Sequence, residues 1–412
     1  MTMNSSSNNP VILAFVSFYL PGYRGGGPIR TIANMVERLG NEFDFRIVTS
    51  DRDFGDQHPY DSIEVDAWNQ VGQARVFYAS PSSRSLWNFA RLMRDTPHDV
   101  LYLNSFFDTK FTLTPLFASR LRLDPRQPIV LAPRGEFSEG AFKLKRWKKA
   151  PFTRLVRWMG LFDRVHWHAS TSYEVADIER VMRAHQSSID IARNIAIAPD
   201  LLQSTLSNLD VEKTLPPMDK VGLRVCFLSR IAPMKNLDYA LKVLAHVKAP
   251  VQFHIYGPKE LPAYWEECEA LIRQLPPNVL VTYGGSVENS QVRSVIAMHD
   301  LFFVPSRGEN FGHVFMEALS AGVPILVSDK TPWRDLKEQK LGWDISLEQL
   351  DEFVRAVEEA AGFDALMRAE MRTRCVSFAR DKAEDSEALD MNRNLFLKVT
   401  SLKNGSPMDA HK

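Results

Sequence analysis

Two glutamates, Glu309 and Glu317, are well spaced for chemistry, because they stand in one loop-to-helix stretch with seven residues between them. The apolar run 300–305 leads into a glycine-bearing loop, and residues 315–321 are good helix formers. This order predicts the first carboxylate in a loop and the second on a helix. N–H groups at a helix start favour an anionic or hydroxyl-rich ligand, and carboxylates accept hydrogen bonds from sugar hydroxyls. The stretch therefore predicts a site for a sugar nucleotide.

A pair of cations, Arg230 and Lys235, follows an earlier apolar run, 223–228, in the segment SRIAPMKN. In an open parallel sheet, ligands bind beyond the carboxyl ends of the strands, so residues after each strand are the candidates for binding. Two cations beside a helix start can neutralise a diphosphate and stabilise it as it leaves. Taken alone, an arginine and a lysine at this spacing fit an exposed surface at least as well.

Together the two motifs resemble those of the retaining, nucleotide-sugar-dependent glycosyltransferases of family 4, whose GT-B fold is two facing Rossmann-like domains. The resemblance implies that one glutamate contacts donor-sugar hydroxyls, backbone amides after it hold the sugar, the other glutamate binds the ribose, and the cations bind the diphosphate. On this chain, Glu309 would contact the sugar hydroxyls, and the amides of Asn310, Phe311 and Gly312 would hold the sugar. Glu317 would bind the ribose, and Arg230 and Lys235 would bind the diphosphate. The resemblance makes Glu309, Arg230 and Lys235 the catalytic candidates.

Glycine-bearing loops after other strands extend the resemblance. Gly257, between a tyrosine and a proline, and Val287, which ends a Gly-Gly-Ser-Val loop, match positions near the nucleotide and its base. Three glycines, 25–27, precede a helical pattern, and the resemblance places Gly26 and Gly27 beside the diphosphate and the acceptor. A tight turn would account for each of these glycines equally well.

The loop after the apolar run 129–132 departs from the family pattern. Many relatives carry a histidine there, whereas this chain has Pro-Arg-Gly-Glu. We expect Arg134 or Glu136 to face the ligand on the acceptor or diphosphate side, without a defined role for either.

The composition is that of a globular protein with two domains, because 412 residues exceed one ordinary core. Lys plus Arg and Asp plus Glu number 50 each, so the net charge does not point to nucleic acid as a partner. The three cysteines are far apart, which argues against a disulfide framework or a structural zinc site and favours a reducing compartment. The apolar run 11–20 has no positive residue before it, so we expect a buried strand and a cytoplasmic protein.

Apolar runs alternate with amphipathic helical patterns in both halves, which predicts an α/β protein with two Rossmann-like, doubly wound parallel sheets facing a cleft. We expect the acceptor-binding domain over 1–205 and the donor-binding domain over 220–380, with a linker in 202–222. By resemblance, a helix in 381–400 crosses back onto the first domain. Residues 401–412 are expected to form a disordered tail.

The runs expected to form strands are short and rich in Val, Ile, Leu and Phe. They are 11–18, 45–49, 75–78, 99–103, 129–132, 165–169 and 191–197 in the first half, and 223–229, 251–256, 279–283, 300–304 and 323–327 in the second. After Gly342 the pattern is wholly helical, from Leu347 through about Val399.

The segment 141–162 contains seven basic residues and no acidic one, with two tryptophans among them. Such a helix can lie on an anionic membrane surface, which predicts possible peripheral contact with the inner face of a membrane. A solvated helix with an apolar inner face fits the same sequence equally well.

Two patterns mimic metal sites. Asp51 and Asp53 have the Asp-x-Asp spacing, and His166 and His168 share one face of an expected strand. Neither pair has a third ligand nearby in the sequence, and the two-domain fold it resembles uses basic residues in place of a metal on the diphosphate. We therefore predict no metal.

These observations predict a retaining glycosyltransferase that moves a sugar from a nucleotide-diphosphate sugar to a saccharide or lipid-linked saccharide, in envelope or exopolysaccharide synthesis. By resemblance, the acceptor attacks on the face from which the diphosphate leaves, and no cofactor is needed beyond the nucleotide sugar. The alternatives are another GT-B enzyme, such as a phosphorylase or an epimerase, and a non-catalytic subunit that binds a sugar nucleotide. A phosphorylase of the glycogen type would need pyridoxal phosphate.

Overall fold

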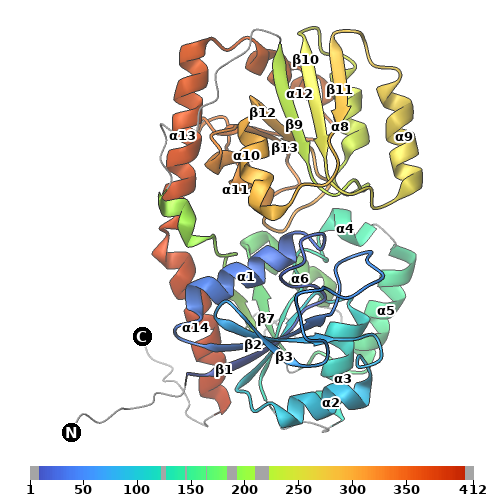
Figure 1. Ribbon diagram of the computed structural model, residues 1–412, viewed down its shortest axis with the longest axis vertical. Coiled ribbons are helices and arrows are strands. Elements are labelled where there is room, and N and C mark those ends of the chain that lie inside the picture. Colours follow the sequence, from blue (N-terminus) through green and yellow to red (C-terminus); the bar gives the residue numbers. More distant parts are fainter. Residues whose placement is uncertain are drawn as a thin grey trace, which may run out of the picture. The chain divides into compact units, whose positions relative to one another are not determined.

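The computed structural model describes residues 9–121, 127–143, 146–163, 165–182, 193–208 and 222–403, and these form two compact units (Figure 1). Among the described residues, the first unit comprises those up to Ser138, Phe142–Gln203 and those from Ser386 onward. The second unit comprises Glu139–Ala141 and Ser204–Asp385. Parts of the expected linker and tail, 209–221 and 404–412, lie outside the described residues.

The first unit is built on a sheet whose eight described strands lie in the order β3-β4-β2-β1-β5-β6-β7-β8. These strands are β1 (Val11–Phe15), β2 (Asp44–Ser50), β3 (Trp68–Val71), β4 (Ala74–Ala79), β5 (Val100–Asn104), β6 (Ile129–Ala132), β7 (Val165–Ala169) and β8 (Ile195–Ile197). The pair β3 and β4 is antiparallel, and the other neighbouring strands in this sheet are parallel. The helices are α1 (Gly27–Leu39), α2 (Leu86–Asp95), η1 (Thr109–Leu113), α3 (Thr114–Arg120), α4 (Glu139–Lys143, partly in the second unit), α5 (Arg146–Trp158), α6 (Ser172–Met182) and α14 (Ser386–Lys403).

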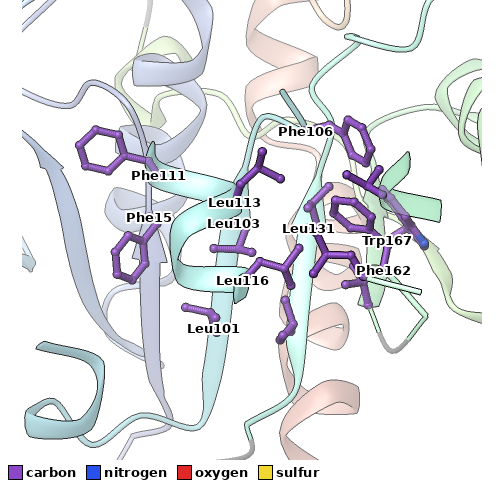
Figure 2. Close-up of a cluster of buried hydrophobic side chains, with 14 of the residues drawn as sticks. Phe15, Leu101, Leu103, Phe106, Phe111, Leu113, Leu116, Leu131, Phe162 and Trp167 are labelled. Atoms are coloured by element: carbon purple, nitrogen blue, oxygen red, sulfur yellow. The ribbon is translucent and has the colours of Figure 1, made fainter. Parts of the chain in front are cut away.

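Alternate side chains of the central strands fill two separate cores, one on each face of this sheet. Phe15, Leu101 and Leu103 belong to a core with side chains of α2, α3, α5 and α6, and Figure 2 shows them beside residues of α3 and β7. Val100 and Tyr102 point the other way, into a core shared with α1 and α14. Because successive side chains in a strand face opposite sides, one continuous apolar run serves both cores.

The last described helix, α14, completes the second of these cores. The ring of Phe396 is fully buried, with its centroid 5.5 Å from that of Phe43 and 5.4 Å from that of Tyr102. Outside this core, the guanidinium of Arg393 donates two hydrogen bonds, of 2.6 and 2.8 Å, to the carboxylate of Glu42. Thus α14, at the C-terminal end of the described chain, packs within the first unit.

The second unit contains a sheet of six described strands in the order β11-β10-β9-β12-β13-β14, and all neighbouring pairs are parallel. The strands are β9 (Leu223–Leu228), β10 (Val251–Tyr256), β11 (Val279–Tyr283), β12 (Leu301–Val304), β13 (Ile325–Ser328) and β14 (Gly342–Ile345). The helices are η2 (Ser204–Asn208), α8 (Leu237–Leu244), α9 (Pro262–Ile272), η4 (Asn289–Gln291), α10 (Val292–Ala297), α11 (His313–Ser320), α12 (Leu350–Ala361) and α13 (Ala365–Ala383).

The predicted fold class, two α/β units with mostly parallel sheets, is confirmed. The helices expected from Leu347 onward are present, but the edge strand β14 (Gly342–Ile345), which precedes them, was not expected from the sequence. This strand depends on its first residue. Gly342 has φ 137°, and a Cβ there would lie 1.8 Å from the carbonyl oxygen of Ile325. The hairpin strand β3 was also not expected from the sequence.

Candidate functional site

The candidate site lies at the point where the strand order of the second sheet reverses. Strands β9 and β12 are neighbours there, although they are separated by two other strands in the sequence. Loops that leave two such strands in opposite directions open a crevice at the carboxyl edge of a sheet, where ligands of this architecture bind. The loop after β9 carries Lys235, and the loop after β12 carries Glu309.

Lys235 and Glu309 meet in this crevice. The ammonium group of Lys235 forms an ion pair with the carboxylate of Glu309, and their side chains are only 16% and 10% exposed. The hydroxyl of Ser306 donates a 2.9 Å hydrogen bond to the same carboxylate oxygen. A charged pair with so little solvent around it interacts more strongly than a surface pair, so both groups are held in defined positions.

Asn236 joins the two loops and fixes the backbone beside this ion pair. Its buried side-chain amide donates a 2.9 Å hydrogen bond to the carbonyl oxygen of Pro305, and its side-chain oxygen accepts a 2.8 Å bond from Arg307. The backbone N–H of Arg307 in turn donates to the carbonyl oxygen of Met234. Asn236 adopts a left-handed conformation, φ 64°, which asparagine tolerates better than most residues. Sequence reasoning missed Asn236 and Ser306, although both lie next to predicted motif residues.

Arg230, the other predicted cation, pairs with a glutamate outside the Glu309 and Glu317 motif. Its guanidinium donates a 2.9 Å hydrogen bond to the carboxylate of Glu260, in the loop after β10, and both side chains are partly exposed. The backbones of the two loops are also joined, because the N–H of Ile231 donates to the carbonyl oxygen of Pro258. Arg230 thus lies at the same carboxyl edge of the sheet, on the loop that also carries Lys235, and pairs with the loop after β10.

Gly257 lies where the backbone of the loop after β10 packs closely against that of the loop after β9. It has φ 131°, and a Cβ at this position would lie 1.9 Å from the carbonyl oxygen of Ser229. Its N–H donates a 2.8 Å hydrogen bond to the carbonyl oxygen of Gly285, and the hydroxyl of Tyr283 donates to the carbonyl oxygen of Gly257. Gly257 therefore holds together the loops that carry Arg230 and Val287, and Val287 is half-buried.

Gly257→Ala is expected to destabilise the second unit by about 1–3 kcal/mol, because the added methyl group overlaps backbone atoms that cannot rotate away. Urea unfolding followed by tryptophan fluorescence would measure the change. Gly55→Ala is the matched control for a positive φ alone, since φ is 84° there and no atom lies within 4 Å of its added Cβ. An equal loss in both variants would show that steric overlap at Gly257 is not the cause.

The other predicted donor residues lie in the glycine-bearing loop and on α11. Gly312 precedes this helix in a left-handed conformation, φ 78°, and the side chains of Asn310, Phe311 and Glu317 are half-buried. The ring N–H of Trp333 donates a 2.7 Å hydrogen bond to the carbonyl oxygen of Phe311, which fixes the loop. The first turn of α11 contains no acidic residue, and no side chain caps its start. Its amide end is therefore suited to an electron-rich ligand.

In the first unit, the glycine-rich loop after β1 leads into α1. Gly26 has φ 76° and precedes the helix, and Gly27 is its first residue. The carboxylate of Asp53, which follows β2, accepts hydrogen bonds of 2.9 and 3.0 Å from the backbone N–H groups of Tyr23 and Arg24. Asp53, the second aspartate of the Asp-x-Asp pattern, thus fixes the glycine-rich loop.

Arg134 and Glu136 lie where their side chains hold the first unit together. The guanidinium of Arg134 forms a 2.6 Å ion pair with Asp200, and the two side chains are 5% and 3% exposed. The carboxylate of Glu136 accepts hydrogen bonds from the hydroxyl of Ser105 and from the backbone N–H groups of Phe106 and Phe107, at 2.7, 2.5 and 3.1 Å. Burial raises the pKa of Glu136 despite these bonds. These contacts hold both side chains inside the unit, and that either residue faces a ligand stays a prediction.

The residues weighed as metal ligands have other partners. Asp51 pairs with Arg84 at 2.8 Å, and it also pairs with the neighbouring arginine. His168 is buried between the hydroxyl of Tyr102 and the carbonyl oxygen of Ala198, each 2.8 Å from a ring nitrogen. Among the described residues, no group of three or more His, Cys, Asp or Glu side chains is arranged to hold a metal ion.

Acidification is expected to destabilise the second unit through buried histidines. Burial and the neighbouring His254 lower the pKa of His299 to about 4, and burial also lowers the pKa of His254. In the unfolded chain these imidazoles take up protons below about pH 6.5, whereas the folded form keeps His299 neutral to about pH 4. Stability present above pH 6.5 is therefore lost as the pH falls toward 4, by about 1–2 kcal/mol at pH 5 from His299 alone. Urea unfolding at pH 7 and pH 5 would measure the loss. His299→Asn should reduce this loss of stability, and an unchanged loss in that variant would contradict the prediction.

A family model matches most of the second unit. Residues 216–382 match the family model described as Glycosyl transferases group 1. The matched range contains Lys235, Glu309 and the strand-order reversal between β9 and β12. Within the described residues, none of the helices combines the length and the apolar composition that crossing a membrane requires.

Curated relatives and solved structures agree with this match. The MMP alpha-(1->4)-mannosyltransferase of Mycolicibacterium hassiacum is 23% identical over 184 residues, which are 44% of this chain and 43% of that protein. The D-inositol 3-phosphate glycosyltransferase of Rhodococcus erythropolis is 26% identical over 168 residues, which are 39% of this chain and 37% of that protein. Each match thus spans less than half the length of the relative. The structure of HepE from Anabaena, in complex with UDP and glucose, has a TM-score of 0.65 and 15% identity, over 95% of this chain and 100% of that one. At 15% identity, this structural similarity shows only that the two proteins share a fold.

Proposed function

We propose that this chain is a retaining glycosyltransferase that moves a sugar from a nucleotide-diphosphate sugar to a saccharide or a lipid-linked saccharide, without a metal ion or a further cofactor. The proposal rests mainly on the buried ion pair between Lys235 and Glu309, which lies in the family-matched range at the reversal point of the sheet. The curated relatives are named as transferases of sugars, and HepE was solved with UDP and glucose, which favours a nucleotide sugar as the donor.

The chemistry assigned to the site follows from its charges. Lys235 and Arg230 neutralise the donor diphosphate, and Glu309 accepts hydrogen bonds from hydroxyls of the donor sugar. The hydroxyl oxygen of the acceptor forms the new bond to the anomeric carbon, while the bond from that carbon to the diphosphate oxygen breaks. The leaving phosphate oxygen takes the acceptor's proton, so no protein side chain has to act as a covalent nucleophile. Before the donor binds, Glu309 holds the Lys235 ammonium in place by the ion pair described above.

A donor screen with the purified chain tests the proposal. UDP-, GDP- and dTDP-sugars are compared by thermal unfolding, because a ligand that binds only the folded state raises the unfolding temperature. One nucleotide class should stabilise the protein, and the same donor should be hydrolysed slowly or transferred to an acceptor. Stabilisation without turnover would favour a non-catalytic binding subunit, and no stabilisation by any donor would contradict the proposal. Absorbance from a bound pyridoxal cofactor would instead favour a phosphorylase.

Lys235→Ala and Lys340→Ala form the matched pair for this screen. Each removes one lysine from a Lys–Glu ion pair of the second unit, but the pair of Lys340 with Glu370 is exposed on both sides. We expect the donor-induced shift to disappear only in Lys235→Ala. Equal shifts in both variants would show that the diphosphate binds elsewhere.

A further inference from the structure

Helix α5 of the first unit presents an apolar outer surface that the proposed reaction does not use. Trp147 is 74% exposed, Leu155 52% and Trp158 77%. In Figure 1 this helix runs along the right-hand border of the first unit. Exposed tryptophans are uncommon on a protein surface, and two on one short helix call for an explanation.

These side chains share one face of the helix. Trp147 and Trp158 are eleven residues apart, which is close to three turns at about 3.6 residues per turn, and Leu155 lies between them on the same side. The opposite face carries Thr153 and Val156, which are buried in the first unit. The helix therefore has an inner face that anchors it to the sheet and an outer face of large apolar side chains.

The inner face is held firmly. Val156 belongs to the core beneath α5, and Phe152 packs beside it with its ring centroid 5.8 Å from that of Phe107. The ammonium of Lys149 lies 4.7 Å from the centroid of the Phe107 ring. The apolar outer face consequently cannot be buried by turning the helix without giving up these contacts.

The charge of the segment indicates what covers this face. Between Ala141 and Phe162 the sequence contains Lys143, Lys145, Lys148, Lys149, Arg146, Arg154 and Arg157, and neither Asp nor Glu. Four of these seven are lysines, which are depleted at protein–protein interfaces, whereas tryptophan beside lysine and arginine is typical of helices at the headgroup level of a bilayer. Basic residues near an anionic membrane surface are attracted to its acidic lipids.

We propose that the outer face of α5 docks on an anionic membrane surface, with Trp147, Leu155 and Trp158 entering the headgroup region and the exposed Arg154 facing acidic lipids. The inference does not depend on the proposed sugar transfer, since it concerns a face in the first unit and not the donor residues of the second. It would bring the first unit to lipid-borne molecules. The helix would lie on the membrane and not cross it.

Co-sedimentation of the full chain with vesicles tests this surface. We expect binding to vesicles that contain phosphatidylglycerol, little binding to pure phosphatidylcholine, and weaker binding as salt screens the charges. Trp147→Ala/Trp158→Ala should weaken binding by about tenfold or more, because two large apolar groups no longer leave water. Trp87→Ala is the matched control, since Trp87 is 70% exposed on α2 of the same unit.

Three results would overturn the proposal. The first is no binding to the anionic vesicles at low salt. The second is equal binding by the double variant and the parent chain. The third is a dimer in solution that the double variant dissociates, which would identify the face as an interface between copies of this chain. Circular dichroism checks that the double variant is folded, and its donor-induced thermal shift should stay unchanged, which separates this test from that of the proposed function.

Discussion

Lys235→Ala is expected to lower sugar transfer by about a hundredfold to a thousandfold, because it removes a charge that stabilises the leaving diphosphate in a site with little solvent. Steady-state rates with the donor identified by the thermal screen would measure the loss. If Lys235 acts mainly as the bond to the diphosphate breaks, the loss falls mostly on kcat. If it binds the ground state equally well, the loss falls mostly on KM.

The variant is expected to remain folded. Removal of Lys235 leaves the Glu309 carboxylate, 10% exposed, with the hydroxyl of Ser306 as a partner, so the cost to stability is about 1–3 kcal/mol. Circular dichroism and the unfolding midpoint would verify this. Lys340→Ala should retain full activity, since its ion pair is exposed.

Glu309→Gln removes the negative charge of this side chain while keeping its shape, so it tests the role of the charge alone. The amide keeps the size of the side chain and can still accept from Ser306, but the ion pair with Lys235 is lost. We expect a similar fall in transfer to that of Lys235→Ala. Full activity in Glu309→Gln or in Lys235→Ala would refute the assigned roles.

Asp200→Ala is expected to destabilise the first unit by about 3–5 kcal/mol, which would be the largest loss of stability among the single substitutions considered. The substitution leaves the guanidinium of Arg134 buried without its carboxylate partner. The hydroxyl of Thr31 would also lose an acceptor, now 3.0 Å away. Arg134 would keep the uncharged acceptors Tyr102 and Asn104, at 2.5 and 3.2 Å, and the weaker attraction of the Glu174 carboxylate, which does not hydrogen-bond to it directly in the structure. Urea unfolding of the full chain would measure the change.

Two further variants test whether the buried charge is the cause of the stability loss in Asp200→Ala. Asp56→Ala breaks an exposed Arg–Asp pair of the same unit, that with Arg24, and is expected to cost less than about 1 kcal/mol. Arg134→Met/Asp200→Leu removes both charges of the ion pair and should be less destabilised than Asp200→Ala, because the guanidinium is no longer buried without Asp200. If Asp200→Ala were no less stable than Asp56→Ala, the buried pair would not be important for the fold.

The fold was largely predictable because its central strands are buried on both faces and therefore appear as continuous apolar runs. The edge strands lack this signal. Trp68–Val71 contains two polar residues among four and pairs on one side only, and Gly342–Ile345 depends on a backbone conformation of its glycine that no composition reveals. The boundary between α13 and α14 near Glu384 was close to the expected start of the last helix.

The residues of the candidate site could be predicted from the sequence, but the contacts between them could not. The motifs marked Lys235 and Glu309, yet their meeting depends on β9 and β12 being neighbours, which is a property of strand order. Arg134 illustrates the opposite case. An arginine between proline and glycine in a loop after a strand suggested a ligand-facing side chain, and its partner Asp200 lies 66 residues further along the chain. Nothing local in the sequence links the two.

Because α14 supplies Phe396 to the core beside β1 and β2, the first unit is assembled from both ends of the polypeptide. A protease cut within 209–221 would leave α14 covalently joined to the second unit through Asp385–Ser386, so the packing of α14 would hold the two fragments together without a covalent bond, and the nicked protein should still run as one species without denaturant. A fragment ending at Gln203 would expose Phe43 and Tyr102 to water. Independent expression of the first unit thus calls for a circular permutation that reattaches the C-terminal helix.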